Sequence, residues 1–186
     1  MKLSALLLLR FFSFSWGFIL TSWSAEAVFP MGPLEEIIIK QVPSYQMVLC
    51  KERSFKQLDD AYLKLTRYTV GQGFGVLKPL ILQLPSLDWD PKQRLIVALP
   101  LPIEKQNEWP KDPHLFLEER ESNRVISIAF QGAYEFETIE PRLKQLKQWM
   151  KDKKLIAAGP PQLLLYHYRS VRFHYWRAAE LQQPIR

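Results

Sequence analysis

Two kinds of apolar pattern alternate along the chain after residue 35. Two segments repeat apolar residues every three or four positions, which places those residues on one face of a helix. The two faces are Phe55, Leu58, Tyr62, Leu65 and Thr69, and Ile139, Leu143, Leu146 and Met150. Short runs rich in β-branched and large aliphatic residues instead predict strands. These runs are residues 36–40, 45–50, 80–84, 94–99, 115–117, 125–130, 163–168 and 171–181.

The order strand, helix, strand, strand occurs twice. Tyr62 and Leu143 lie 81 positions apart, and so do Pro79 and Pro160. A constant offset between equivalent positions is the signature of a duplicated unit. Each unit alone would leave a sheet face and a helix side uncovered, so we expect the two units to pack together.

The duplication predicts an α+β fold. We expect a mostly antiparallel sheet with two helices on one face and a groove between the repeats. The predicted domain covers residues 36–185. It divides into repeat one at 36–102, a linker at 103–114 and repeat two at 115–185.

The first 27 residues have the features of a targeting segment. Lys2 precedes a mostly apolar stretch, and Ala25-Glu26-Ala27 has the small-x-small form of a cleavage site. Arg10 interrupts the stretch and leaves about ten apolar residues, whereas a membrane-spanning helix needs about 20. We predict a secretory signal peptide at 1–27, with an uncleaved N-terminal membrane anchor as the alternative, and a spacer at 28–35. The protein is then secreted or periplasmic, or anchored to the membrane by its N-terminus.

Composition limits the classes of function. The 186 residues carry 25 Lys and Arg against 19 Asp and Glu, a formal charge of +6 that forms no dense basic block. A thinly spread positive charge is typical of a solvated surface, so we expect no nucleic-acid partner. Cys50 is the only cysteine, which excludes an internal disulfide and a multi-cysteine metal site. The three histidines, His114, His167 and His174, come with no evident third ligand, so we predict no metal.

The second half contains an ordered set of motifs. They are Gly132-x-Tyr134 after a strand, Trp149 at a helix end, Gly159-Pro160, a strand with Tyr166, and Glu180-x-x-x-Pro184. This order resembles the GyrI-like small-molecule (effector) binding domain family, to which SOUL haem-binding proteins are structurally related. The resemblance covers roughly residues 36–185 and implies the duplicated strand-helix-strand-strand unit. In the first half, Ser54-Phe55 and Leu82–Pro85 depart from the family pattern, so that wall of a pocket is expected to differ.

Glu180 is the sharpest candidate for a binding residue. Strand alternation puts it on one face with Ala178 and Trp176. A carboxylate beside a tryptophan in a partly dry groove needs a positive or hydrogen-bonding partner. A cationic aromatic ligand would supply that charge, and nearby rings would add cation–π contacts. The resemblance implies a glutamate used in this way. The alternative is a surface acid paired with Arg177 or Arg186.

Aromatic residues are the candidate walls of the site. Tyr134, Tyr166, Trp176 and Phe55 would line the groove, although tyrosines at strand ends also serve as lids of an apolar core. Trp89, in a predicted loop, is either a rim residue or a hydrophobic plug.

The sequence therefore predicts an exported small-molecule-binding protein that holds a hydrophobic ligand, which can be cationic, in the groove. No cofactor is predicted. One alternative is a SOUL-like haem or tetrapyrrole binder, which needs only one axial histidine. Another is a small-substrate hydrolase with Glu180 as general base, helped by Tyr134. The chain has no nucleophile elbow, phosphate loop or zinc motif, so an enzyme is not the first expectation. A structural or partner-binding role, with the groove filled by side chains, is also open.

Overall fold

The structure, a computed structural model, describes residues 29–52, 54–102, 109–167 and 177–186, without the side chains of 52, 55 and 177. The predicted signal peptide lies outside these residues. Within them the chain forms one sheet, two α-helices and a short 3₁₀ turn, η2. The elements are β1 (Ile37–Val42), β2 (Tyr45–Glu52), η2 (Phe55–Gln57), α1 (Leu58–Gly71), β3 (Leu80–Gln83), β4 (Leu95–Leu101), β5 (Leu115–Arg120), β6 (Asn123–Gly132), α2 (Phe136–Asp152), β7 (Gln162–Leu165) and β8 (Arg177–Ile185).

The sheet order is β1-β6-β8-β7-β3-β4-β2-β5, and all of its ladders are antiparallel. The unit β2-α1-β3-β4 recurs as β6-α2-β7-β8. Leu82 pairs with Leu163 in the central β3–β7 ladder, and Val42 pairs with Asn123 at the meeting of β1 and β6. Both pairs are 81 positions apart, the offset of the sequence repeat. Equivalent residues meet only on a symmetry axis, so a pseudo-twofold axis passes through both pairs.

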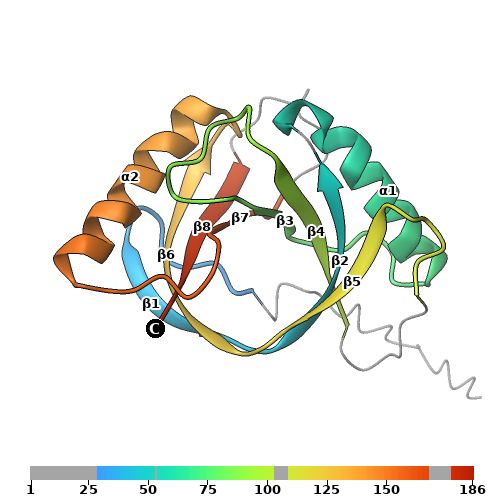
Figure 1. Ribbon diagram of the computed structural model, residues 1–186, viewed down its shortest axis with the longest axis horizontal. Coiled ribbons are helices and arrows are strands. Elements are labelled where there is room, and N and C mark those ends of the chain that lie inside the picture. Colours follow the sequence, from blue (N-terminus) through green and yellow to red (C-terminus); the bar gives the residue numbers. More distant parts are fainter. Residues whose placement is uncertain (1–28, 53, 103–108, 168–176) are drawn as a thin grey trace, which may run out of the picture.

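The sheet is strongly curved, with the helices on its outside (Figure 1). β1 continues into β2, and β5 continues into β6, as two bent ribbons that pair along their length. At the bend, Gln41 Nε2 donates to Ser122 Oγ at 2.7 Å, and that hydroxyl donates to the Val42 carbonyl at 3.1 Å. The α+β prediction of a mostly antiparallel sheet with two helices is confirmed.

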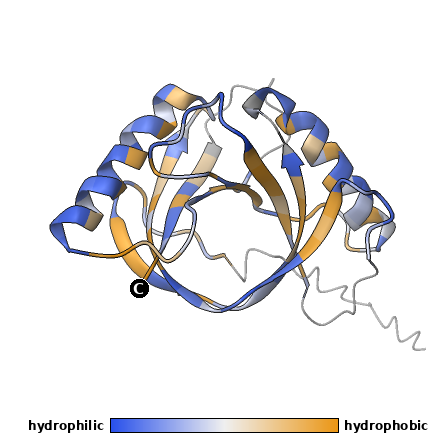
Figure 2. Cartoon of the chain, viewed as in Figure 1, coloured by the Kyte–Doolittle hydropathy of each residue, from blue (hydrophilic) through white to orange (hydrophobic). Residues whose placement is uncertain are grey.

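The main core lies between the helices and the outer face of the sheet. The buried positions of α2 are Ile139, Leu143, Leu146 and Met150, which is the predicted face. Apolar positions of both helices face the sheet and polar ones face outward (Figure 2). Trp89 is 3% exposed and meets Phe136 edge-on, with ring centroids 5.8 Å apart, so it is a plug rather than a rim residue. No helix of the described residues is long and apolar enough to cross a membrane.

A second cluster of buried residues lies on the opposite, inner face of the sheet. Its members are Phe29, Val42, Tyr45, Met47, Leu49, Ile81, Ala98, Val125, Leu164, Tyr166 and Ala178. Most come from strands of both halves, and their side chains cover this face. The groove expected between the repeats stays a prediction. The N-terminal end of the described chain runs across it (Figure 1). We call residues 29–34 the strap; they fall within the predicted spacer, yet Phe29 is only 1% exposed.

Candidate functional site

Glu180 lies on the inner face at the middle of the sheet. On β8 it pairs with Ala129 of β6 on one side and Leu164 of β7 on the other. Its neighbours Ala179 and Leu181 turn into the outer core, as the alternation of a strand requires. The side chain is 0% exposed, so Glu180 is not a surface acid.

Two side chains meet the Glu180 carboxylate. Lys40 Nζ, from β1, lies 2.6 Å from Oε1, and its side chain is 14% exposed. Tyr166, just beyond β7, donates its hydroxyl to Oε2 at 2.8 Å. A buried carboxylate needs such partners because losing its water shell is costly. The partner expected from a cationic ligand is therefore supplied, in this structure, by the chain itself.

The strap passes over this polar group. Lys40 Nζ donates to the Pro30 carbonyl at 2.7 Å, and Tyr166 Oη lies 3.1 Å from the Phe29 carbonyl oxygen. A methyl group added at Gly32 would lie 3.7 Å from Glu180 Oε1. The same two donors thus contact both the carboxylate and two consecutive strap carbonyls.

A second polar group lies further along the inner face. Gln182 pairs across the strands with Ser127 on one side and Gln162 on the other. Gln162 Nε2 donates to the Tyr45 hydroxyl at 3.3 Å, and burial raises the pKa of Tyr45 above its ordinary 10.0. Ser127 Oγ and both polar atoms of the Gln182 amide are buried without a hydrogen-bond partner among the described residues. Such atoms are costly in a dry site, so they are candidates to meet polar groups of a ligand.

The structure brings together two of the five residues predicted from the sequence, Glu180 and Tyr166. Tyr134 belongs to the outer core and donates its hydroxyl to the Ala178 carbonyl at 3.0 Å, so it lies across the sheet from Glu180. Trp176 and the side chain of Phe55 lie outside the described part of the chain. The ligand contacts proposed for these three residues stay predictions.

Lys40, Tyr45 and Phe29 are among the residues of this site that were not singled out from the sequence. Lys40 is a lone cation in a β-branched run, and its alternation with Val42 could have placed it on the inner face. Tyr45 has the same signal, as a strand residue two positions before Met47. Phe29 has none, because no periodic pattern surrounds it.

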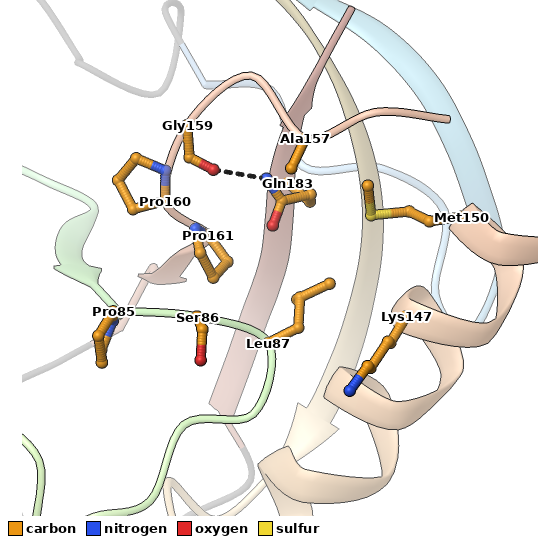
Figure 3. A pocket seen from close by; sticks show the side chains of 10 residues that line it. All are labelled: Pro85, Ser86, Leu87, Lys147, Met150, Ala157, Gly159, Pro160, Pro161 and Gln183. Carbon is orange, nitrogen blue, oxygen red and sulfur yellow. Dashed lines mark hydrogen bonds between the residues drawn. The ribbon is translucent and has the colours of Figure 1, made fainter. Parts of the chain in front are cut away.

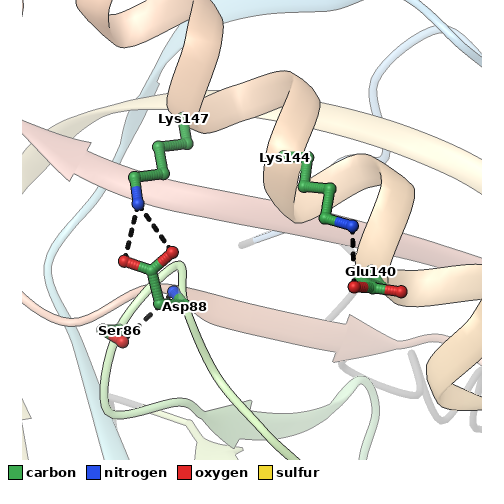
Figure 4. Close-up of polar contacts among 5 residues, drawn as sticks. All are labelled: Ser86, Asp88, Glu140, Lys144 and Lys147. Atoms are coloured by element: carbon green, nitrogen blue, oxygen red, sulfur yellow. Dashed lines mark hydrogen bonds and ion pairs between the residues drawn. The ribbon is translucent and has the colours of Figure 1, made fainter.

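Two surface pockets lie beside the helices, away from Glu180. The first, about 460 Å³, is lined by Pro85, Ser86, Leu87, Lys147, Met150, Ala157, Gly159, Pro160, Pro161 and Gln183 (Figure 3). At its rim, Lys147 Nζ holds both carboxylate oxygens of Asp88 at 2.6 and 2.7 Å (Figure 4). The second, about 450 Å³, lies between α1 and the segment around Trp109. An exposed ion pair at the mouth of the first pocket contributes little to binding or stability.

Solved structures share this fold at low sequence identity. A hydrolase from Listeria innocua is 11% identical with a TM-score of 0.63, over 88% of this chain and 98% of that one. The EcmrR C-terminal domain is 13% identical with a TM-score of 0.57, over 81% and 97%. In the EcmrR–DNA complex the identity is 13% and the TM-score 0.59, and this chain spans 57% of the EcmrR chain. At such identities the likeness establishes the fold alone.

The family is shown by the sequence itself. No curated protein matches the chain significantly. A family model described as SOUL heme-binding protein matches residues 35–181, which includes repeat one, most of repeat two and Glu180. The GyrI-like family is not named by this match, whereas the SOUL proteins, expected as its structural relatives, are. The chain is a small-molecule-binding domain by this kinship, and it belongs to the SOUL heme-binding protein family.

Proposed function

We propose that this protein binds a hydrophobic small molecule on the inner face of its sheet, beside Glu180 and Tyr166. The observation that carries the proposal is a fully buried carboxylate on a face that is otherwise mostly apolar. A buried ion pair is weak evidence of stabilisation, because hydrophobic residues of similar volume are often as stable. Recognition of a ligand explains the Glu180 cluster better than fold stability does, and the family match supports a small-molecule ligand.

A cationic ligand is a special case of this proposal. Glu180 supplies the negative charge, but Lys40 Nζ already lies 2.6 Å from it. A ligand cation would therefore have to displace Lys40 or share the carboxylate with it. The ring of Tyr45 offers an aromatic surface within the same buried cluster.

Haem is the alternative that the family name raises. The described residues do not fit it. His114 and His167 are both exposed, none of the described histidines belongs to the inner-face cluster, and His174 lies outside the described part of the chain. We assign no haem chemistry to this site.

The hydrolase alternative has no specific support in the geometry. Glu180 Oε1 is paired with Lys40 and Oε2 accepts from Tyr166, so a general base would first have to lose these partners. Tyr134, its proposed helper, lies on the other side of the sheet. The Listeria innocua neighbour is called a hydrolase, and its 11% identity carries the fold alone.

Export is proposed on the apolar segment and cleavage-like motif at residues 1–27. Expression of the full chain with an N-terminal sequencing read would test it: a mature start near residue 28 supports export, and an intact Met1 in the cytoplasm contradicts it. The expectation of no nucleic-acid partner stays a prediction, since one structural neighbour is an EcmrR–DNA complex.

A thermal-shift panel of apolar molecules tests the proposed function. At 100 times its Kd, a ligand stabilises the folded protein by about 2.7 kcal/mol. We expect Glu180→Gln and Tyr166→Phe to reduce the shift, and Lys147→Ala, at the pocket of Figure 3, to leave it unchanged. A shift that depends on Lys147 and not on Glu180 would place the ligand on the helical side and refute the proposal.

A further inference from the structure

We propose that the strap occupies the ligand site when no ligand is bound. The ligand that displaces it is an aromatic molecule with a hydrogen-bond acceptor oxygen, which Lys40 binds. The oxygen belongs to a carboxylate, a sulfonate or a carbonyl group. This inference rests on the proposed function for the place of binding. It adds the chemical class of the ligand and the step that precedes its entry.

Phe29 shows which apolar group the site accepts. Its ring is 1% exposed and meets Tyr45 edge-on, with centroids 4.8 Å apart and planes at 78°. This geometry is the favourable one for two aromatic rings. The remaining strap side chains are not buried; Met31, for example, is 41% exposed. One aromatic ring is therefore the strap's apolar anchor.

The strap carbonyls show which polar group the site accepts. The ammonium of Lys40 has three N–H donors; it forms an ion pair with Glu180 and donates a hydrogen bond to the Pro30 carbonyl. Tyr166 has a single hydrogen, and Glu180 is its nearer acceptor. Lys40 is thus the donor that a new occupant can use, and that occupant must bring an acceptor to the position of the Pro30 oxygen.

The charges of the site also favour an acceptor oxygen over a cation. Lys40 and Glu180 cancel each other, so the site as it stands offers no net negative charge to a cation. A ligand cation in the place of the Pro30 oxygen would lie against the ammonium group, and like charges at that distance repel. An anionic or carbonyl oxygen there gains a charge-assisted hydrogen bond instead.

The strap can leave without unfolding the sheet. Glu35 N–H donates to the Ala129 carbonyl at 2.7 Å, and Leu34 forms a bridge to the same residue. These bonds hold the chain just after the strap. Among the described residues, the contacts that hold 29–33 are those of the Phe29 ring and of the two strap carbonyls. Release of the strap therefore requires the loss of one buried ring, of the hydrogen bond from Lys40 to the Pro30 carbonyl, and of the 3.1 Å contact between the Phe29 carbonyl and the Tyr166 hydroxyl.

Fluorescence titration of the full chain tests the inference with two dyes that share an aromatic body. 8-Anilinonaphthalene-1-sulfonate carries an acceptor anion, and N-phenyl-1-naphthylamine lacks it. If the strap competes with the dye, weakening the strap raises the fraction of competent protein, so Phe29→Ala should lower both Kd values at least about tenfold. Met31→Ala changes an exposed residue of the same strap and should leave them unchanged.

Gly32→Val provides an independent variant if Phe29→Ala folds poorly. A Cβ atom there would lie 3.0 Å from Ile38 Cδ1, a tight contact, and 3.7 Å from Glu180 Oε1, and the two methyl groups of valine need further room. It should dislodge the strap and tighten dye binding while Phe29 is retained.

The acceptor preference has its own readout. In Lys40→Met/Glu180→Gln, which removes both charges, we expect the preference for the sulfonate dye over the neutral dye to fall at least about tenfold. Lys40→Met alone leaves Glu180 for a cation, so tetraphenylphosphonium should bind it more tightly than it binds the wild type.

These results distinguish the proposed ligand site from the proposed occupation of that site by the strap. If Phe29→Ala and Gly32→Val bind the dyes as the wild type does, while Glu180→Gln weakens binding, the strap does not occupy the site and the proposed function stands. If the dye preference is the same without Lys40, the acceptor class is wrong. If no variant binds any of the three probes, the proposed function fails and this inference fails with it.

Discussion

Removing Lys40 is the sharpest test of the buried cluster. Lys40→Met keeps most of the side-chain volume and leaves the Glu180 carboxylate, 0% exposed, with only the hydroxyl of Tyr166. Breaking a buried ion pair by removing one partner typically costs 3–5 kcal/mol. The Lys40 side chain is 14% exposed, so the ion pair is not fully shielded from water. We therefore take the lower end of this energy range. We expect a loss of about 3 kcal/mol in the free energy of unfolding.

Urea denaturation at fixed pH and salt measures this loss. In a chain of this size about 3 kcal/mol corresponds to a fall in Tm of roughly 6–12 °C. Glu180→Gln and the double variant complete a double-mutant cycle, which isolates the coupling between the two side chains. The double variant should be more stable than Lys40→Met alone, because no charge is left buried. A coupling energy below about 0.5 kcal/mol would show that the two groups are adjacent and energetically independent.

Three further predictions concern the inner face and the core. Gln182→Met should raise the free energy of unfolding by about 1–3 kcal/mol in urea titrations without ligand, because it removes buried polar atoms that have no partner among the described residues. Burial raises the pKa of Tyr45, with the Gln162 bond and Arg120 opposing the rise, so the stability contributed by its neutral phenol is complete below about pH 10 and is lost as the pH rises through the raised value. Tyr45→Phe should therefore lose less stability than the wild type between about pH 9 and 11, as followed by chemical denaturation. Leu143→Ala, in the outer core, should cost about 2–5 kcal/mol and leave dye binding on the inner face unchanged.

Periodic features of the fold could be predicted from the sequence because they are local. The spacing of Leu143 and Leu146 fixes a helix face wherever the helix packs. The constant offset of 81 between repeats appears in space as the pairing of Leu82 with Leu163 on the pseudo-twofold axis. Alternation along β8 likewise predicts that Glu180 lies on the face opposite to Leu181, whatever its partners are.

The rest of the site depends on contacts that no local pattern encodes. Tyr134 could not be assigned to a face by alternation, because it follows Gly132, where φ is +152° and β6 ends. The approach of Lys40 to Glu180 depends on the curvature of a sheet in which β1 and β8 are separated by β6. Phe29 lies in a proline-containing stretch with no period, and only the folded sheet provides the cluster in which its ring is buried.

The charged and aromatic groups of the inner face already have partners within the chain, so a ligand that binds there must replace existing contacts. Glu180 has its cation, Lys40 has its acceptors, and Phe29 fills the aromatic position. A ligand therefore exchanges with the strap instead of adding to a vacant surface, so its affinity reflects the difference between its contacts and those of the strap. A ligand that only reproduces a phenyl ring and one carbonyl gains little. A larger aromatic molecule gains about 25 cal/mol for each additional Å² of apolar surface that it buries, provided that an oxygen still reaches Lys40. Apolar area should thus rank ligands of this site only among those that carry the acceptor.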